Sequence, residues 1–239
     1  MGEKKLDLQP RLQALADWVR PGARLADVGT DHGYLPVWLR LHGVVEHAIA
    51  SDLRPAPLDH ARRSAAAYGA SDIEFRLCDG LKGIASEEAD TVVVAGMGGE
   101  NIAAILEASP WCMDGAHFLL LQPMSRDQQL RAWLPLHGGR VLRERLVEDK
   151  GTLYPILEVV GGAMPPATPA QCYGGFALSG DPLWGAYLEE RITKLRRAAE
   201  GLRRSSGEEE QLRGAELEKL AEELCVRKGE WEHANCGRD

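Results

Sequence analysis

Apolar and polar positions along the first two thirds of the chain alternate in a way that predicts strands separated by helices. Five short apolar runs, each followed by a polar or glycine-rich segment, lie at residues 25–28, 48–52, 73–79, 91–95 and 118–122. Residues 10–19 begin with a proline and repeat apolar side chains on one helix face, and helical patterns separate the runs that follow. Strands alternating with helices indicate an α/β fold with a doubly wound, Rossmann-like sheet.

Two later runs, residues 140–147 and 153–160, flank a turn-forming segment and predict an antiparallel hairpin that closes the sheet. Pro155 lies inside the second run and cannot donate a backbone hydrogen bond, so we expect it at a sheet edge or a bulge. A stretch rich in Gly and Pro follows between residues 161 and 169. We therefore expect a first domain at residues 1–162, and a linker with a second domain at residues 163–239.

The second domain has a helical pattern. Its apolar residues recur every three or four positions on either side of a break at residues 205–207, at Leu188, Ile192, Leu195, Ala199 and Leu202, then at Leu217, Leu220, Ala221 and Leu224. Two helices with one apolar stripe each predict a coiled-coil-like helical hairpin. The first helix is rich in basic residues, including Arg196, Arg197, Arg203 and Arg204. These form either a solvated face with cross-helix ion pairs or an arm that binds phosphates.

The turn after the first strand carries the most informative motif. Asp27 ends the strand, and Gly29 and Gly33 follow at a G-x-x-x-G spacing, where a helix should begin. Glycines let a backbone approach a ligand closely, and a helix N-terminus offers free N–H groups. The G-x-G-x-x-G spacing of dinucleotide sites is absent, which makes a nicotinamide dehydrogenase a poor alternative. An acid beside the turn suits a ligand with a cationic group, such as S-adenosylmethionine (SAM).

Acids also end the next two predicted strands, at Asp52 and Asp79. In an open parallel sheet, ligands bind outside the carboxyl ends of the strands, so the three acids should converge on one crevice. Asp52 is placed to accept hydrogen bonds from both ribose hydroxyls, and Asp79 to reach the adenine amine. The plainer interpretation is that aspartates at strand ends form turns.

The chain resembles the bacterial TrmK-type tRNA adenine-N1 methyltransferases over nearly its whole length. The resemblance is carried by Asp-Val-Gly-Thr-Asp-His-Gly-Tyr-Leu-Pro at 27–36, Cys-Asp-Gly-Leu at 78–81, Ala-Gly-Met-Gly-Gly at 95–99, Leu-Gln-Pro-Met at 121–124 and Glu-Asp-Lys-Gly-Thr-Leu-Tyr-Pro-Ile at 148–156. It implies SAM as cofactor, adenine 22 of tRNA as the substrate, and a helical C-terminal domain that helps to hold tRNA. The sequence departs from the family pattern at Gly33, Ala56 and Cys78.

Composition is compatible with this family but adds one constraint. The 239 residues are 44% hydrophobic and 27% charged, with no secretory or membrane-spanning segment, so we expect a cytoplasmic enzyme. Five cysteines lack metal-binding spacing, so reduced thiols and no metal are expected. The net charge of −8 argues against general coating of RNA and requires a local basic face. Oligomeric state stays open.

The predicted loop at residues 95–99 bears on the reaction. It has no Asn/Asp-Pro-Pro-aromatic sequence, which enzymes that methylate exocyclic amines commonly use. Adenine N1 has a free lone pair at neutral pH, so positioning and removal of water can supply much of the catalysis. Met97 could pack on the base, and Asp31 or His32 could assist proton loss from the amine, although both could instead cap the helix.

These arguments give three groups of candidate residues. Candidates for the chemistry are Asp31, His32 and Met97; candidates for SAM binding are Asp27, Gly29, Thr30, Gly33, Tyr34, Asp52, Leu53, Cys78, Asp79, Gly80, Ala95 and Gly96. Candidates for substrate binding are Gly98, Gly99, Gln122, Arg11, Arg54, Arg126, Arg196 and Arg197, with Arg131 a further phosphate contact. The target adenine must be extruded from folded tRNA to reach them. Alternatives are a SAM enzyme for a small molecule or protein, and a non-catalytic RNA-binding protein.

Overall fold

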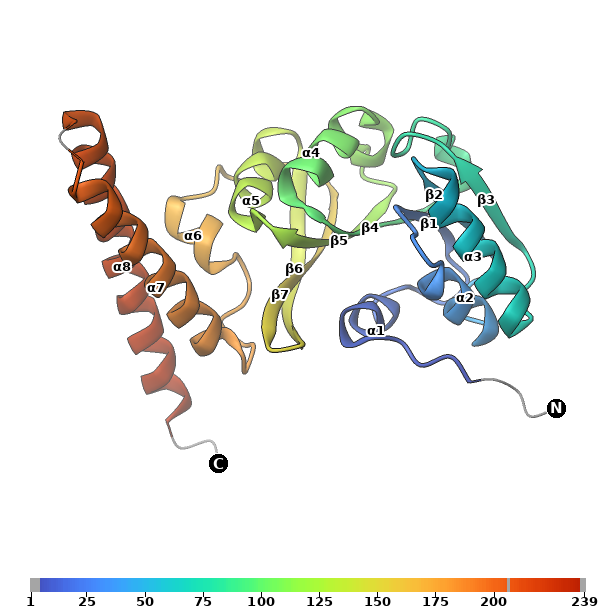
Figure 1. The fold of residues 1–239 in the computed structure, drawn as a ribbon, viewed down its shortest axis with the longest axis horizontal. Coiled ribbons are helices and arrows are strands. Elements are labelled where there is room, and N and C mark those ends of the chain that lie inside the picture. The colour runs from blue at the N-terminus through green and yellow to red at the C-terminus, as the bar shows by residue number, and fades with distance from the viewer. Residues whose placement is uncertain (1–4, 206, 237–239) are drawn as a thin grey trace. The chain divides into compact units, whose positions relative to one another are not determined.

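The structure, a computed structural model, describes residues 5–205 and 207–236 and divides into two compact units, Met1–Pro166 and Ala167–Asp239 (Figure 1). Most of the N-terminal segment 1–6, in which no apolar leader was expected, lies outside the described residues, as does Ser206 in the break at residues 205–207. Within the described parts of the chain, no helix is both long and apolar enough to cross a membrane.

The first unit is built on one seven-stranded sheet in the order β3-β2-β1-β4-β5-β7-β6. The first five strands run parallel, and β7 pairs antiparallel with both β5 and β6. This confirms the predicted doubly wound, Rossmann-like sheet. The strands are β1 Arg24–Val28, β2 His47–Asp52, β3 Ile73–Leu77, β4 Thr91–Gly98, β5 Phe118–Ser125, β6 Gly139–Asp149 and β7 Thr152–Gly161.

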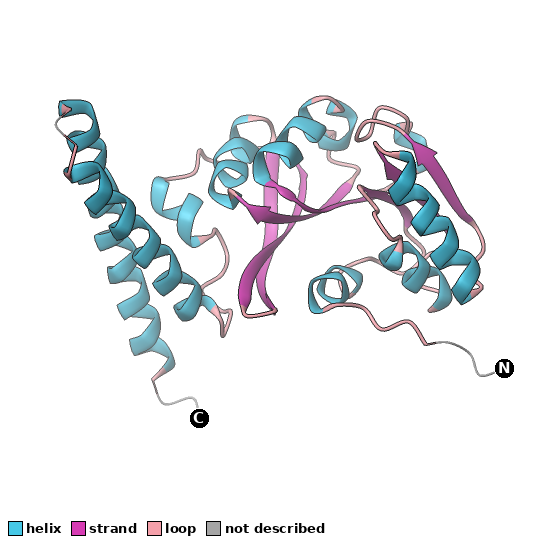
Figure 2. Ribbon diagram, in the orientation of Figure 1, coloured by secondary structure: helices cyan, strands magenta, loops and turns pink. Residues whose placement is uncertain are grey.

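Helices cover both faces of this sheet (Figure 2). In β4, Val92 and Val94 pack into one core with side chains of α4 and α5, whereas Val93 packs into another with side chains of α1 and α2. Burial on both faces explains why the central strands are continuous apolar runs. The helices and 3₁₀ turns of this unit are α1 Pro10–Ala16, α2 Tyr34–Leu41, α3 Pro55–Tyr68, η1 Ser86–Glu88, α4 Gly99–Glu107, η2 Pro110–Met113 and α5 Asp127–Leu136.

The hairpin of β6 and β7 forms as predicted, and Pro155 lies at a local edge of the sheet, although β7 as a whole is not the edge strand. β7 is an interior strand between β5 and β6, and the register shift of the hairpin lies between Val141 and Arg143. The proline is tolerated because pairing with β5 reaches only Leu157, so Pro155 has β6 as its single neighbouring strand.

The second unit contains α6 Pro169–Gly174, α7 Trp184–Arg203 and α8 Glu208–Asn235. Most of the predicted apolar stripes are buried, at Leu188, Ile192, Leu195 and Ala199 of α7 and at Leu220, Ala221 and Leu224 of α8. The predicted packing of two C-terminal helices is therefore confirmed. Sequence reasoning missed α6, which begins at Thr168 with a capping box in which the hydroxyl accepts the Gln171 N–H.

Arg131 is fully buried, which corrects its assignment as a surface phosphate contact. Its guanidinium donates hydrogen bonds to Asp127 and to Glu144, each at a distance of 2.7 Å, and both carboxylates are buried as well. The cluster joins α5 to β6 inside the unit. Arg131 is therefore part of the core of the fold rather than of an RNA surface.

We expect Arg131→Ala to lower the free energy of unfolding by about 3–5 kcal/mol, because it leaves two buried carboxylates without their cation. The matched control is Arg126→Ala, five positions earlier, whose ion pair with Glu100 is about half exposed on both sides. That change should cost less than about 1 kcal/mol. Denaturant unfolding of both variants measures the difference, and equal effects would contradict a structural role for Arg131.

Candidate active site

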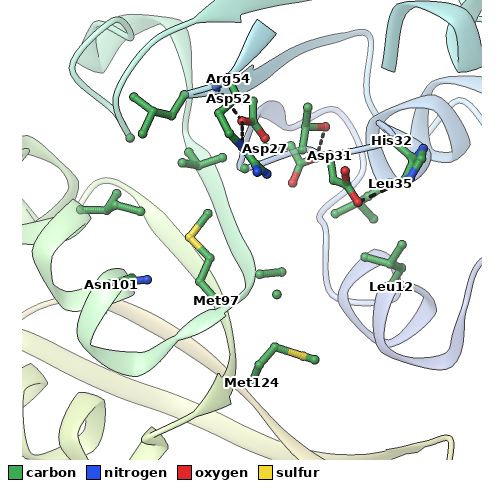
Figure 3. A pocket seen from close by; sticks show the side chains of 18 of the residues that line it. Leu12, Asp27, Asp31, His32, Leu35, Asp52, Arg54, Met97, Asn101 and Met124 are labelled. Carbon is green, nitrogen blue, oxygen red and sulfur yellow. Dashed lines mark hydrogen bonds and ion pairs between the residues drawn. The ribbon is translucent and has the colours of Figure 1, made fainter. Parts of the chain in front are cut away.

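A pocket of about 830 Å³ opens at the carboxyl ends of the parallel strands (Figure 3). β1 lies between β2 and β4, and the chain leaves β1 toward β2 but returns to β4 on its other side. This reversal of strand order is the position where open α/β sheets bind ligands. Residues that follow β1, β2 and β3 form one wall, and the ends of β4 and β5 with α4 form the other.

The turn after β1 is held tightly against β2. The N–H groups of Gly29 and Thr30 both donate to the carbonyl of Ser51, at 2.8 and 2.9 Å. Gly29 has φ of +72°, and a Cβ there would lie 2.1 Å from the methyl group of Met97. Gly33 has φ of +67° and would place a Cβ 2.8 Å from that of Ala61. Gly29 therefore leaves space at the pocket floor, whereas Gly33 lets α2 and α3 pack closely.

Asp27 is a buried acid in this pocket with one oxygen already occupied. The Thr30 hydroxyl donates to its Oδ2 over 2.6 Å. Burial raises the pKa of Asp27 from 3.8 to about 6, the Thr30 hydrogen bond opposes the rise, and the negative charge of Asp52 adds to it. A cationic ligand group would favour the ionised carboxylate, so the site is suited to a positive charge.

Asp52 lies on the same side of the pocket and is also buried. Its Oδ1 accepts the backbone N–H of Arg54 at 2.9 Å, which orients the carboxylate. Its Oδ2 makes no hydrogen bond to any residue that the structure describes. An oriented carboxylate with a free oxygen is the acceptor that a ribose diol requires.

Asp79 differs from the other two acids. It lines the pocket together with Cys78 and Gly80, but its side chain is 56% exposed and forms an ion pair with Lys82 at 2.5 Å. The three strand-end acids therefore converge on one pocket as expected, although only Asp27 and Asp52 are buried in it.

The sequence predicted a loop at residues 95–99, but most of this Gly-rich segment belongs to strand β4. β4 continues to Gly98 and stays paired with β5, with Ala95 opposite Gln122 and Met97 opposite Pro123. Gly96, with φ of +76°, is the extra residue of a bulge between these pairs. Bulges re-aim side chains, and here the Met97 side chain points into the pocket (Figure 3).

Gln122 is fully buried and lies behind this bulge, which corrects its assignment as a base contact. Its Oε1 accepts the Gly96 N–H at 3.3 Å and the Arg11 guanidinium at 3.0 Å, and its Nε2 donates to the Pro123 carbonyl at 3.0 Å. The amide satisfies the backbone group that the bulge removes from the ladder. Gln122 thus positions the pocket wall and does not face a substrate.

Three arginines of the first unit were candidates for substrate binding, and the structure divides them into two groups. Arg11 and Arg54 line the pocket; Arg11 also donates to Asp149 at 2.7 Å, and Arg54 is mostly exposed beside Asp52. Arg126 pairs with Glu100 and does not line the pocket. Arg54 is therefore the guanidinium most available to an anionic ligand at the pocket mouth.

Asp31, His32 and Tyr34 lie at the pocket mouth. The side chain of Asp31 is 67% exposed and that of His32 46%, with His32 Nε2 3.7 Å from the Asp31 carboxylate. The ring of His32 stacks between those of Tyr34 and His60, at centroid distances of 5.3 and 5.0 Å. His60 was assigned no role from the sequence.

The remaining candidates lie outside the pocket lining. Gly33, Gly98 and Gly99 do not line it; Gly33 and Gly99 serve chain packing instead, and a Cβ on Gly99 would lie 2.3 Å from the Arg126 carbonyl. Arg196 and Arg197 belong to the second unit. All candidates from the sequence analysis that were not placed elsewhere above line the pocket, namely Asp27, Gly29, Thr30, Asp31, His32, Tyr34, Asp52, Leu53, Cys78, Asp79, Gly80, Ala95, Gly96, Met97, Arg11 and Arg54.

Sequence reasoning missed Asn101 of α4 and Met124 of β5, which line the pocket near Met97 (Figure 3). Asn101 is the third residue of the helix that follows β4. The sequence could have indicated Asn101, because it is a polar residue in the first turn of a helix that directly follows a glycine-rich strand end. The described residues include no cluster of three or more possible metal ligands.

Comparisons with known proteins agree with this geometry. A family model described as "Methyltransferase domain" matches residues 8–157. The tRNA (adenine(22)-N(1))-methyltransferase of Bacillus subtilis (strain 168) is 36% identical over 185 residues, which cover 77% of this chain and 76% of that protein. The chain belongs to the TrmK-type methyltransferase family.

Solved structures extend the likeness. A Streptococcus agalactiae protein of the NADB-Rossmann superfamily has a TM-score of 0.84 and 29% identity, and covers 95% of this chain and 100% of that one. TrmK of B. subtilis has a TM-score of 0.80 and 29% identity, over 92% and 99% of the two chains. A Streptococcus pneumoniae protein solved with SAM has a TM-score of 0.78 and 32% identity, over 90% and 97%.

The residues of this TrmK-type pocket fit SAM. Asp27 is a buried acid for a cationic group, Asp52 offers a free oxygen for hydroxyls, and Gly29 has no side chain where the pocket floor is narrow. We expect Asp27 to contact the methionine amine and Asp52 to contact the ribose.

The first test concerns Asp27. We expect SAM affinity to rise between pH 5 and about pH 7 as this carboxyl ionises, and Asp27→Asn to bind at least about tenfold more weakly with little dependence on pH. Calorimetry over this pH range measures both. A wild-type affinity that is constant across it would contradict a contact between Asp27 and the cation.

The same substitution has an opposite effect on the ligand-free protein. Because the folded-state pKa lies above the unfolded value, stability linked to Asp27 is present below pH 3.8 and lost as pH rises through about 6. Asp27→Asn retains an acceptor for Thr30 and removes this loss. It should therefore raise the thermal midpoint of the ligand-free protein at about pH 8 and have little effect at about pH 4.

Proposed function

We propose that this chain transfers the methyl group of SAM to N1 of an adenine in tRNA, with adenine 22 as the first position to examine. Membership of the TrmK-type family supports the reaction class. The observation that carries the proposal is the bulge at Gly96, which turns the thioether of Met97 into the pocket beside Asp27 and Asp52. Adenine presents a flat ring to this wall.

The chain's residues act mainly by positioning. SAM supplies a methyl group made electrophilic by a sulfonium. Asp27 orients the methionine end of the cofactor, Asp52 orients its ribose, and Met97 packs on the face of the substrate adenine. Asn101, at the pocket margin, can accept a hydrogen bond from the adenine amine and so present N1. Because N1 has a free lone pair, the site needs no base before attack, and holding the reactants together while water is excluded lowers the barrier.

Asp31 and His32 are the groups available for the proton that the adenine amine loses afterwards. Both lie at the pocket mouth and are open to solvent, so they can pass a proton to water. This places them after methyl transfer, and their loss should slow turnover less than the loss of cofactor contacts.

The helical hairpin of the second unit carries several arginines, and they differ in whether an acidic side chain of the hairpin already pairs with them. Arg196 and Arg203 both approach Glu218 of α8, each at 3.6 Å, and Arg204 pairs with Glu200. Arg197 is exposed and makes no ion pair with any described residue. We propose that Arg197 contacts tRNA phosphates, whereas Arg196 and Arg203 mainly join the two helices. A tRNA substrate also places the enzyme in the cytoplasm.

Methyl transfer from radiolabelled SAM to bulk tRNA, followed by nucleoside mass spectrometry, tests the proposed reaction. We expect N1-methyladenosine as the product. Asp52→Ala should lose most activity and at least about tenfold in SAM affinity, because the ribose loses a charge-assisted acceptor. Exclusive formation of N6-methyladenosine, or labelling of protein but not of tRNA, would refute the proposal.

Charge reversal tests the hairpin. We expect Arg197→Glu to raise the Michaelis constant for tRNA and to reduce its salt dependence by about one counterion, because one phosphate contact is lost. Turnover at saturating tRNA and SAM affinity should stay nearly unchanged. Arg203→Gln, which removes a cross-helix partner of Glu218, is the control and should have a smaller effect on both kinetic quantities. A Michaelis constant and a salt dependence that stay unchanged in Arg197→Glu would contradict a phosphate contact at Arg197.

A further inference from the structure

Three aromatic rings form a continuous stack beside the pocket. His32 is nearly parallel to Tyr34, with an interplanar angle of 10°, and to His60, with an angle of 13°. Tyr34 begins α2, whereas His60 belongs to α3, so the stack crosses from one helix to the next. Tyr34 and His32 line the pocket, and His60 does not. The stack therefore leads from the pocket mouth to a second position on the surface.

His60 lines a separate hollow of about 410 Å³. The other residues of this hollow are Ala56, Asp59, Arg62 and Arg63, all on α3, and none of them lines the main pocket. Ala56 has a small side chain at the first turn of the helix. The hollow is thus bounded by one aromatic ring, a small residue and three charged groups.

The charges of the hollow favour an anion. Arg62 donates to Asp59 over 3.0 Å, so one cation and the carboxylate compensate each other. Arg63 donates to the backbone carbonyl of Asp59 at 3.2 Å and pairs with no carboxylate among the described residues. One guanidinium therefore remains to bind a phosphate next to a ring that can stack on a base.

We propose that this hollow is a subsite for a second nucleotide of the RNA, one that directly neighbours the methylated adenine. Its base stacks on His60, and Arg63 contacts its phosphate. The proposal rests on the proposed function, because it needs an RNA strand whose target base enters the main pocket. Stacking on His60 helps to keep the strand open beside the extruded adenine, and so offsets part of the cost of extrusion.

The simpler role for His60 is to fix the ring of His32. The two roles differ in what they change. A residue that only positions His32 should affect turnover and should be indifferent to the neighbouring nucleotide. A stacking subsite should affect the Michaelis constant for tRNA and should depend on the presence of that nucleotide's base.

The test uses the full-length enzyme with His60→Ala and His60→Phe. We expect His60→Ala to raise the Michaelis constant for tRNA about tenfold, since stacking of one base is lost, while SAM affinity by calorimetry is unchanged. His60→Phe keeps a ring and should restore a value near that of the wild type. If His60→Phe is as impaired as His60→Ala, the ring does not stack on RNA.

A second measurement couples the side chain to the base. Two tRNAs are used, one with an abasic site directly before the methylated adenine and one with an abasic site directly after it. One of these two abasic sites should raise the Michaelis constant of the wild-type enzyme. The same abasic site should have little further effect on His60→Ala, because the two changes remove one interaction. If the abasic site and His60→Ala raise the Michaelis constant additively at both flanking positions, the subsite is refuted, even when the adenine is methylated normally. Failure of the wild type to methylate tRNA would instead overturn the proposed function.

Arg63 gives an independent check. Arg63→Gln should lower the slope of tRNA affinity against salt by about one. The control is Arg24→Gln at the start of β1, where Arg24 forms a partly exposed ion pair with Asp90 at the opposite end of the strand from the pocket. This change should leave the slope unaltered. Equal slopes for wild type and Arg63→Gln would show that no phosphate binds in the hollow.

Discussion

One buried amide, that of Gln122, determines the shape of the pocket wall. It accepts hydrogen bonds from Gly96 and Arg11 and donates one to Pro123, so it joins α1, β4 and β5 at a single point. The bulge removes the Gly96 N–H from the ladder with β5, and the Gln122 side chain supplies the acceptor that this N–H would otherwise lack. With that group satisfied, β4 can bulge and turn Met97 toward the ligand. The apolar wall that suits an adenine ring therefore depends on a polar group hidden behind it.

Two buried carboxylates make the floor of the pocket suited to a cationic ligand group. Asp27 and Asp52 are buried near each other, and the raised pKa of Asp27 records the cost of that burial. A cationic cofactor removes the cost by compensating the charge. Burial of Asp27 thus lowers the stability of the ligand-free fold, and its proposed contact with the cofactor offsets that cost, a usual relation between stability and function at a binding site.

In the proposed complex, contacts to RNA are divided between stacking and charge. The ring stack of Tyr34, His32 and His60 offers flat faces near the pocket, where bases must leave their helix. Exposed guanidiniums such as Arg63 and Arg197 can bind phosphates, which gives affinity without sequence preference. Arg196 and Arg203, by contrast, are drawn toward Glu218. The proposal therefore assigns RNA binding to a few local cations, because the net charge of the whole chain repels nucleic acid.

The sequence by itself determined the alternation of strands and helices, the tight turn at Gly29 and the placement of Asp27 and Asp52 at strand ends, because these depend on local periodicity and backbone conformation. Only the tertiary structure decided that Gln122 faces inward, that Arg131 lies in the core and that His60 stacks on His32. Each of these depends on partners distant in the chain, such as Arg11 for Gln122 and Glu144 for Arg131. A polar side chain has the same local pattern whether it faces a ligand or a buried partner, and only packing settles which one it meets.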